Sequence, residues 1–152
     1  MSLGRHAVFW AVAVFLVSTA PANAQAPSAY DQATWNRWAL NCQGCHRPNG
    51  GGTPGGAPPM RGVVGSFLRV EGGRAYLTQV PGVATAPLRD EELAQLLNYV
   101  LRRFDGAGLP DDFKPYTAAE VAAGRRTLLR TDAAAIRRRL MARLSGANQQ
   151  TK

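Results

Sequence analysis

The chain has 152 residues, a formal net charge of +8 and only two cysteines. A length in this range indicates one small domain with short appendages. The two cysteines are separated by only two residues, so a disulfide between them would close almost no chain and would remove little entropy from the unfolded state. A structural disulfide framework is therefore excluded.

The first 24 residues have the layout of a secretory signal peptide. Arg5 precedes an apolar run from about Ala7 to Ala20, and Ala22-Asn23-Ala24 supplies a cleavage site of small residues. A retained membrane anchor is the alternative, but this run is shorter than the ~20 apolar residues that a membrane span needs. We therefore expect cleavage after Ala24, export to the periplasm, and a mature chain in which His46 is the only histidine.

A helix is predicted from about Ala29 to Asn41, directly before the sequence Cys42-Gln43-Gly44-Cys45-His46. Trp35 and Trp38 lie three residues apart and therefore share one face of this helix. They are expected to pack against the last helix of the core, and contact with the edge of a cofactor is the alternative.

The sequence from Cys42 to His46 places three side chains that can bind a metal or cofactor within five residues. A zinc site needs four ligands, and the mature chain offers only two cysteines and one histidine. A thioredoxin-like dithiol begins a helix that follows a strand, and no β-branched run precedes Cys42. The third alternative is covalent haem, for which C-x-x-C-H is the attachment signature. We favour haem over zinc and over a redox dithiol.

From about Ser28 to Phe104 the chain resembles the class I, monohaem cytochrome c family. The resemblance rests on a helix leading into CQGCH, a Gly/Pro-rich loop after the histidine, and a final helix, LRDEELAQLLNYVLRRF, with an acidic start. It implies an all-α fold, in which a small cytochrome c-like domain wraps one covalent haem c with its iron. It also implies that Cys42 and Cys45 hold the haem and that His46 is the proximal iron ligand.

The segment from Arg47 to Gly65 is so rich in Gly and Pro that no regular element is expected there. It is either a disordered linker or, in a small haem protein, a loop that wraps the porphyrin. In the family, a proline about a dozen residues after the histidine offers its carbonyl oxygen to the imidazole N–H. Pro58 fits that role.

The family usually supplies a second, distal iron ligand, a methionine that often stands just before a proline and ahead of the last helix. Val80 occupies this place before Pro81, and a valine side chain cannot ligate iron. The methionines left in the mature chain are Met60, in the Gly/Pro-rich loop, and Met141, in the C-terminal tail. We predict Met60 as the distal ligand. An iron without a distal protein ligand, or one bound by Met141, is the alternative.

Two more helices are predicted before residue 108. A short one covers about Gly73 to Gln79, and residues 81–87 are expected to be extended or irregular. The longer one covers Asp90 to Phe104 and completes a cytochrome c domain over residues 25–108. Its apolar residues follow the i, i+3, i+4, i+7 spacing of a buried helix face: Leu93, Leu96, Leu97, Val100, Leu101 and Phe104.

Residues 109–152 form a basic helical C-terminal extension, which the compact family core does not need. Thr117 and Glu120 match a capping box, and a further helix is expected after Asp132, with Ile136, Leu140 and Leu144 on one face. Residues 121–152 carry eight Lys or Arg and one acidic residue, whereas residues 25–120 carry nine of each sign. The extension is either a solvated helix face or a docking surface for an acidic redox protein or an anionic membrane. Nucleic acid is not expected as a partner.

No catalytic triad, paired-carboxylate site or phosphate-binding loop stands out in the sequence. We therefore expect an electron-transfer protein rather than an enzyme, which carries single electrons to or from a partner such as a periplasmic dehydrogenase or oxidase. The alternative is a haem protein with an open distal site, acting as a gas sensor or in peroxidase-like chemistry. A haem that serves only as a structural staple is a third interpretation.

Overall fold

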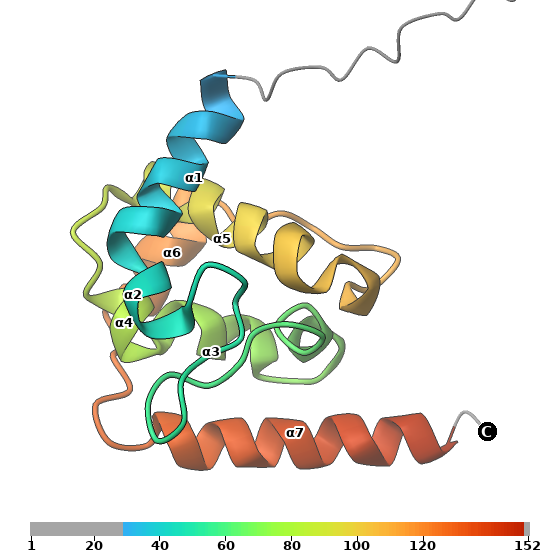
Figure 1. The fold of residues 1–152 in the computed structure, drawn as a ribbon. Coiled ribbons are helices and arrows are strands. Elements are labelled where there is room, and N and C mark those ends of the chain that lie inside the picture. The colour runs from blue at the N-terminus through green and yellow to red at the C-terminus, as the bar shows by residue number, and fades with distance from the viewer. Residues whose placement is uncertain (1–28, 151–152) are drawn as a thin grey trace, which may run out of the picture.

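The computed structural model describes residues 29–150, and every regular element among them is a helix (Figure 1). This confirms the prediction of a small, all-α, cytochrome c-like fold. The predicted signal peptide, residues 1–24, lies outside the described residues. In chain order the elements are α1 (Ala29–Asn41), α2 (Gln43–His46), the 3-10 turn η1 (Ser66–Arg69), α3 (Gly73–Gln79), α4 (Pro81–Ala84), α5 (Asp90–Asp105), the 3-10 turn η2 (Gly106–Gly108), α6 (Ala118–Arg125) and α7 (Ala133–Gln150).

Helices α1, α3 and α5 lie where the sequence predicts them, with α5 one residue longer than expected. Helix α4 differs from the prediction, because residues 81–84 form a helical turn rather than an irregular segment. Pro81 stands at the first helical position, where the fixed φ of proline suits a helix start and its missing N–H leaves no bond unmade. The turn thus follows from a local backbone preference of Pro81.

The apolar face of α5 forms the centre of the core. Leu101 is fully buried, and Leu93 and Leu96 are each 2% exposed, as their spacing predicts. Each such side chain contributes about 1.5–3 kcal/mol on burial. Trp38 of α1 packs on the same helix, and its ring centroid lies 4.8 Å from that of Phe104. This tilted aromatic contact confirms that Trp38 packs against the last helix of the predicted domain.

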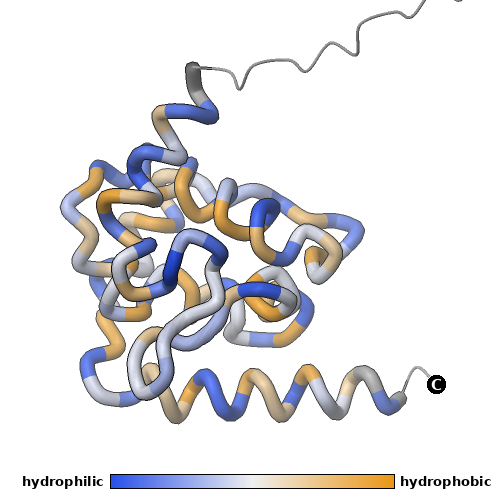
Figure 2. Tube along the Cα trace, viewed as in Figure 1, coloured by the Kyte–Doolittle hydropathy of each residue, from blue (hydrophilic) through white to orange (hydrophobic). Residues whose placement is uncertain are grey.

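The C-terminal segment belongs to the same hydrophobic core. Tyr116, Val121 and Leu140 are buried together with the residues of α5. Helix α6 packs on α3 and α5, and α7 runs along η1 and α3 (Figure 1). Figure 2 shows hydrophobic positions interspersed with hydrophilic ones along α7, in keeping with a helix that packs on one face. The sequence-based boundary at residue 108 therefore does not coincide with a break in the packing.

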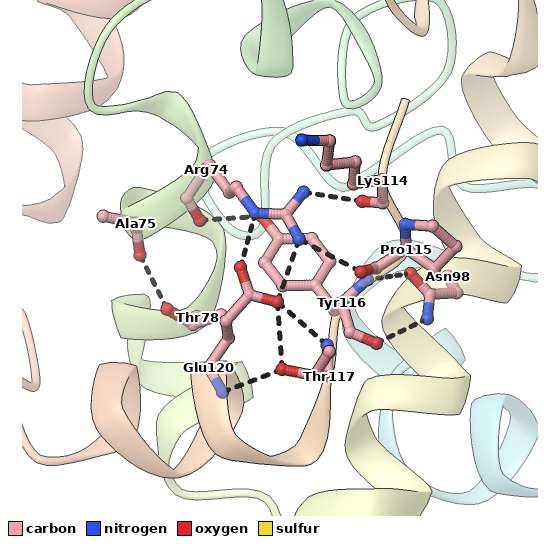
Figure 3. A network of polar contacts seen from close by, with 9 residues as sticks. All are labelled: Arg74, Ala75, Thr78, Asn98, Lys114, Pro115, Tyr116, Thr117 and Glu120. Atoms are coloured by element: carbon pink, nitrogen blue, oxygen red, sulfur yellow. Dashed lines mark hydrogen bonds and ion pairs between the residues drawn. The ribbon is translucent and has the colours of Figure 1, made fainter. Parts of the chain in front are cut away.

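A polar network joins α3 to the start of α6 (Figure 3). Arg74 forms a two-pronged ion pair with Glu120, with N···O distances of 2.7 and 3.0 Å, and also donates to the carbonyl oxygens of Lys114 and Pro115. Glu120 accepts from the Thr117 N–H and donates its own N–H to the Thr117 hydroxyl, which confirms the predicted capping box. The guanidinium beside Glu120 lowers the pKa of that carboxyl group to about 2.

The same network reaches α5 through Tyr116 and Asn98. The Tyr116 hydroxyl donates to the Arg74 carbonyl oxygen at 2.7 Å. The Asn98 side chain donates to the Tyr116 carbonyl oxygen at 3.0 Å and accepts its N–H at 2.7 Å. Because these bonds satisfy buried polar groups on three elements at once, they hold α3 at a defined position against α5 and α6.

Candidate functional site

Cys42, Cys45 and His46 lie on a single helical turn that continues α1. The Cys42 N–H donates to the Trp38 carbonyl oxygen at 2.9 Å, and the N–H groups of Cys45 and His46 both donate to the Cys42 carbonyl oxygen, at 3.2 and 3.0 Å. Residues three apart lie on one helix face, so the two thiols share a side. Both cysteines and His46 line the same cavity.

The imidazole of His46 is oriented by Pro58. His46 Nδ1 lies 3.1 Å from the Pro58 carbonyl oxygen. A carbonyl oxygen can only accept, so Nδ1 carries the proton and Nε2 keeps a free lone pair. Burial lowers the pKa of His46, although the bond to Pro58 acts in the opposite direction. A neutral imidazole with one nitrogen fixed and the other free is the form that ligates a metal.

The Gly/Pro-rich loop folds back onto His46. The Gly52 N–H donates to the His46 carbonyl oxygen at 3.1 Å. Gly52 has a φ of +72°, and a Cβ at this position would lie 2.5 Å from the Ala57 carbonyl oxygen and 2.7 Å from the Pro58 carbonyl carbon. Only glycine permits both this backbone conformation and this close approach. The segment after the histidine is thus an ordered wall of the cavity, not a linker.

A cavity of about 680 Å³ opens beside the turn that carries His46. Its walls are the turn from Cys42 to His46, the loop around Pro58, the segment from α3 to α4, the apolar face of α5 and the start of α7. Cofactor sites have volumes of about 300–1,000 Å³, and protein interiors are otherwise packed without large voids. Two thiols and a neutral imidazole on one wall of an apolar cavity fit a covalently attached haem.

The zinc and dithiol alternatives fit this geometry less well. Burial raises the pKa of the Cys42 thiol to about 11, with a smaller effect from Cys45, whereas a reactive dithiol needs a lowered pKa. No strand precedes Cys42 in the part of the chain that the structure describes. Among these residues no three His, Cys, Asp or Glu side chains converge to hold a metal ion by themselves.

Met60, Met141 and Val80, the positions relevant to a distal iron ligand, lie in different parts of the structure. Met60 lines the cavity, and its N–H donates to the Gly50 carbonyl oxygen at 2.9 Å. Met141 lines a separate pocket, of about 330 Å³, that contains neither His46 nor the cysteines. Val80 lines the cavity from the end of α3. The structure thus brings Met60 but not Met141 into the cavity, and the role of Met60 as an iron ligand stays a prediction.

Sequence reasoning missed the part of α7 that borders the cavity. Ala133, Arg137 and Arg138 line it. Arg137 donates to the Pro59 carbonyl oxygen at 3.3 Å, and its guanidinium carbon lies 5.7 Å from the centroid of the Phe67 ring. The apolar spacing of residues 136, 140 and 144 already indicated that α7 packs on the molecule. This spacing could not indicate that α7 packs at the border of the cavity.

Two proteins named Cytochrome c-552, both from Thermus thermophilus, are similar to this chain. One is 37% identical over 111 residues, covering 61% of this chain and 75% of the relative. The other is 37% identical over 108 residues, covering 59% of this chain and 82% of the relative. No protein-family model matches the chain.

Within the match this chain is shorter than its relatives. The match covers 61% of the 152 residues of this chain, which is about 93 residues, whereas the alignment has 111 positions. At about 18 aligned positions the first relative therefore has a residue where this chain has a gap. The remaining positions carry enough identity, over enough of each relative, to establish common descent. Together with the all-helical fold around the Cys42–His46 cavity, they show that the chain belongs to the class I, monohaem cytochrome c family.

Proposed function

We propose that this cytochrome c is exported to the periplasm and carries single electrons between redox proteins. The observation that supports this most directly is the turn from Cys42 to His46, which opens on an apolar cavity with the imidazole oriented by Pro58. Cys42 and Cys45 would hold the haem through thioether bonds, and His46 would ligate its iron through Nε2. The haem iron supplies the one-electron chemistry.

The chain's own residues would set the reduction potential. Leu93, Leu97 and Val100 of α5 line the cavity and exclude water from it. A low dielectric disfavours the more positively charged oxidised state and so raises the potential. Arg137 and Arg138, at the α7 side of the cavity, are suited to pair with the carboxylates of the haem propionates.

The proposal of export rests on the signal-peptide pattern of the first 24 residues. None of the helices that the structure describes is long and apolar enough to cross a membrane. Cleavage after Ala24 would be read directly from the N-terminal residue of the protein recovered from the periplasm.

The C-terminal segment is the proposed docking surface for an acidic redox partner. Arg126, Arg130, Arg139 and Arg143 are exposed, and Arg138 is exposed beside the cavity. Arg125 does not belong to this surface, because carbonyl oxygens and Asp90 already bind its guanidinium. Positive charge close to the cavity would speed encounter with an acidic protein, and salt would weaken the effect.

Covalent haem attachment tests the proposal. The full chain is expressed with a c-type cytochrome maturation system and separated on a denaturing gel stained for haem. We expect stain on the wild-type chain and none when Cys42→Ala and Cys45→Ala are combined. Gly44→Ala is the matched control, because a Cβ there has no neighbour within 4 Å and both thiols remain. A wild-type chain without covalent haem contradicts the proposal.

A further inference from the structure

We propose that the cavity presents no protein ligand to the iron opposite His46, and that a small uncharged diatomic molecule, such as carbon monoxide or nitric oxide, binds there. The inference rests on the proposed function, since it requires a haem held by His46. It concerns the wall built by the end of α3, α4 and the connection to α5.

This wall is made of side chains that cannot ligate iron. Val80, Val83 and Ala86 line the cavity, and their side chains are wholly aliphatic. In the segment from Val80 to Arg89 only Thr85 and Arg89 carry polar side chains, and neither lines the cavity. The place from which the family usually supplies a methionine is therefore occupied by aliphatic groups.

The wall is also held in position. Arg125 of α6 donates to the carbonyl oxygens of Ala84, Ala86 and Leu88, at 3.1, 2.8 and 2.9 Å, and to the Asp90 carboxylate at 2.8 Å. Only five residues, 85–89, connect α4 to α5. No long loop is present between α4 and α5 that could bring in a ligand from elsewhere.

The backbone of Met60 is held within the loop whose Pro58 carbonyl oxygen is bonded to His46. Its N–H donates to the Gly50 carbonyl oxygen, and its carbonyl oxygen accepts the Val64 N–H, both at 2.9 Å. Pro58, two residues earlier, is bonded to His46 Nδ1. The backbone of Met60 is thus tied on both sides within the loop that orients the proximal histidine. This arrangement argues against the prediction of Met60 as the distal ligand.

The remaining groups of the lining favour a neutral ligand over peroxide. The Tyr76 ring packs edge-on against Phe67 at 5.6 Å, and burial raises the pKa of its hydroxyl, so the phenol stays protonated. A protonated phenol can donate a hydrogen bond to a bound molecule but is a poor iron ligand. The lining contains no carboxylate and no histidine besides His46, so the acid–base group that peroxide cleavage uses is missing.

The experiment is a carbon monoxide titration of the full chain with covalent haem, reduced with dithionite and followed by its visible spectrum. We expect the Soret band of the wild type to shift on addition of the gas. Met60→Leu should keep the wild-type spectrum and the wild-type affinity for carbon monoxide. Circular dichroism is recorded in parallel, because an unfolded chain also exposes its iron.

The inference is overturned if the folded wild type with covalent haem does not bind carbon monoxide, and the variants then identify the ligand. If the folded wild type ignores carbon monoxide and Met60→Leu acquires the shift, Met60 is the distal ligand. If carbon monoxide shifts the Soret band of Tyr76→Phe but not that of the wild type or of Met60→Leu, the distal ligand is Tyr76. The haem-stained gel separates these from failure of the proposed function: a stained chain that does not bind the gas refutes only the open site, and an unstained chain refutes both.

Discussion

At the scale of single residues, one glycine determines how the loop meets the histidine. Gly52 combines a positive φ with a backbone approach to Ala57 and Pro58 that leaves no room for a Cβ. Pro58 in turn accepts the His46 Nδ1–H. A side chain at residue 52 would therefore displace the carbonyl oxygen that orients the imidazole.

We predict that Gly52→Ala lowers the free energy of unfolding by about 2–4 kcal/mol, because backbone strain and a steric clash add. Urea unfolding followed by circular dichroism measures this. Gly55→Ala is the matched control, since Gly55 has a φ of +70° but no neighbour within 4 Å of the added Cβ. It should cost only the strain, about 1–2 kcal/mol. Equal losses in the two variants would show that the approach to Pro58 is not tight.

At the scale of elements, α6 organises the segment that forms the aliphatic wall. Arg125 donates to three carbonyl oxygens between Ala84 and Leu88 and also pairs with Asp90 at the start of α5. Gly124, the residue before it, permits the close approach of α6 to α3, because a Cβ there would overlap the Thr78 hydroxyl. The C-terminal segment is thus a structural part of the cavity.

We predict that Arg125→Leu lowers the free energy of unfolding by about 2–4 kcal/mol, because it removes four charge-assisted hydrogen bonds, one of them to the Asp90 carboxylate. Chemical denaturation provides the measurement. Arg126→Leu changes the same charge at the neighbouring, exposed position and should stay within about 0.5 kcal/mol of the wild type. Similar effects of the two substitutions would mean that net charge, and not the contacts of Arg125, determines stability.

The network between α3 and α6 makes stability depend on pH. The hydrogen bond and ion pair with Arg74 lower the folded-state pKa of Glu120 to about 2, below its value of about 4.3 in an unfolded chain. The resulting stabilisation is present above the unfolded pKa and is lost as pH falls toward 2. Between pH 6 and pH 3 we expect the melting temperature of Glu120→Gln to fall less than that of the wild type. Glu91→Gln, at an exposed position on α5, should follow the wild type.

At the scale of the whole molecule, charge is concentrated on the C-terminal segment, close to the cavity. Eight of the 18 Lys and Arg residues lie after residue 120, with a single acidic residue among them. Under the proposed function, the exposed arginines of α7, whose start borders the cavity, would attract a negatively charged electron donor or acceptor.

We predict that combining Arg130→Glu with Arg139→Glu slows oxidation of the reduced protein by ferricyanide about tenfold at low ionic strength, with the difference disappearing in high salt. Stopped-flow absorbance provides the rates. Arg102→Glu combined with Arg103→Glu changes the net charge equally on α5 and should have a smaller effect. A cationic cobalt(III) oxidant should show the opposite dependence. Equal slowing by both pairs would mean that only total charge matters.

Much of the fold and part of the site could be predicted from local patterns. The bounds of α1 and α3, the buried face of α5 and the capping box at Thr117 all depend on contacts between residues a few positions apart. The position of Cys42, Cys45 and His46 on one turn has the same origin, because hydrogen bonds to the Cys42 carbonyl oxygen close it. Such short-range interactions are encoded by spacing and residue type alone.

The sequence by itself determined the helices α1, α3 and α5, the Cys-x-x-Cys-His turn and the absence of a methionine at Val80. Only the tertiary structure decided that Arg125 binds the α4 segment, that Met60 is tied beside Pro58, and that α7 borders the cavity. These contacts join residues from about 10 to almost 80 positions apart, as between Arg137 and Pro59. These long-range contacts depend on which helix faces pack together in the folded chain, and the spacing of residues along the sequence does not specify that packing.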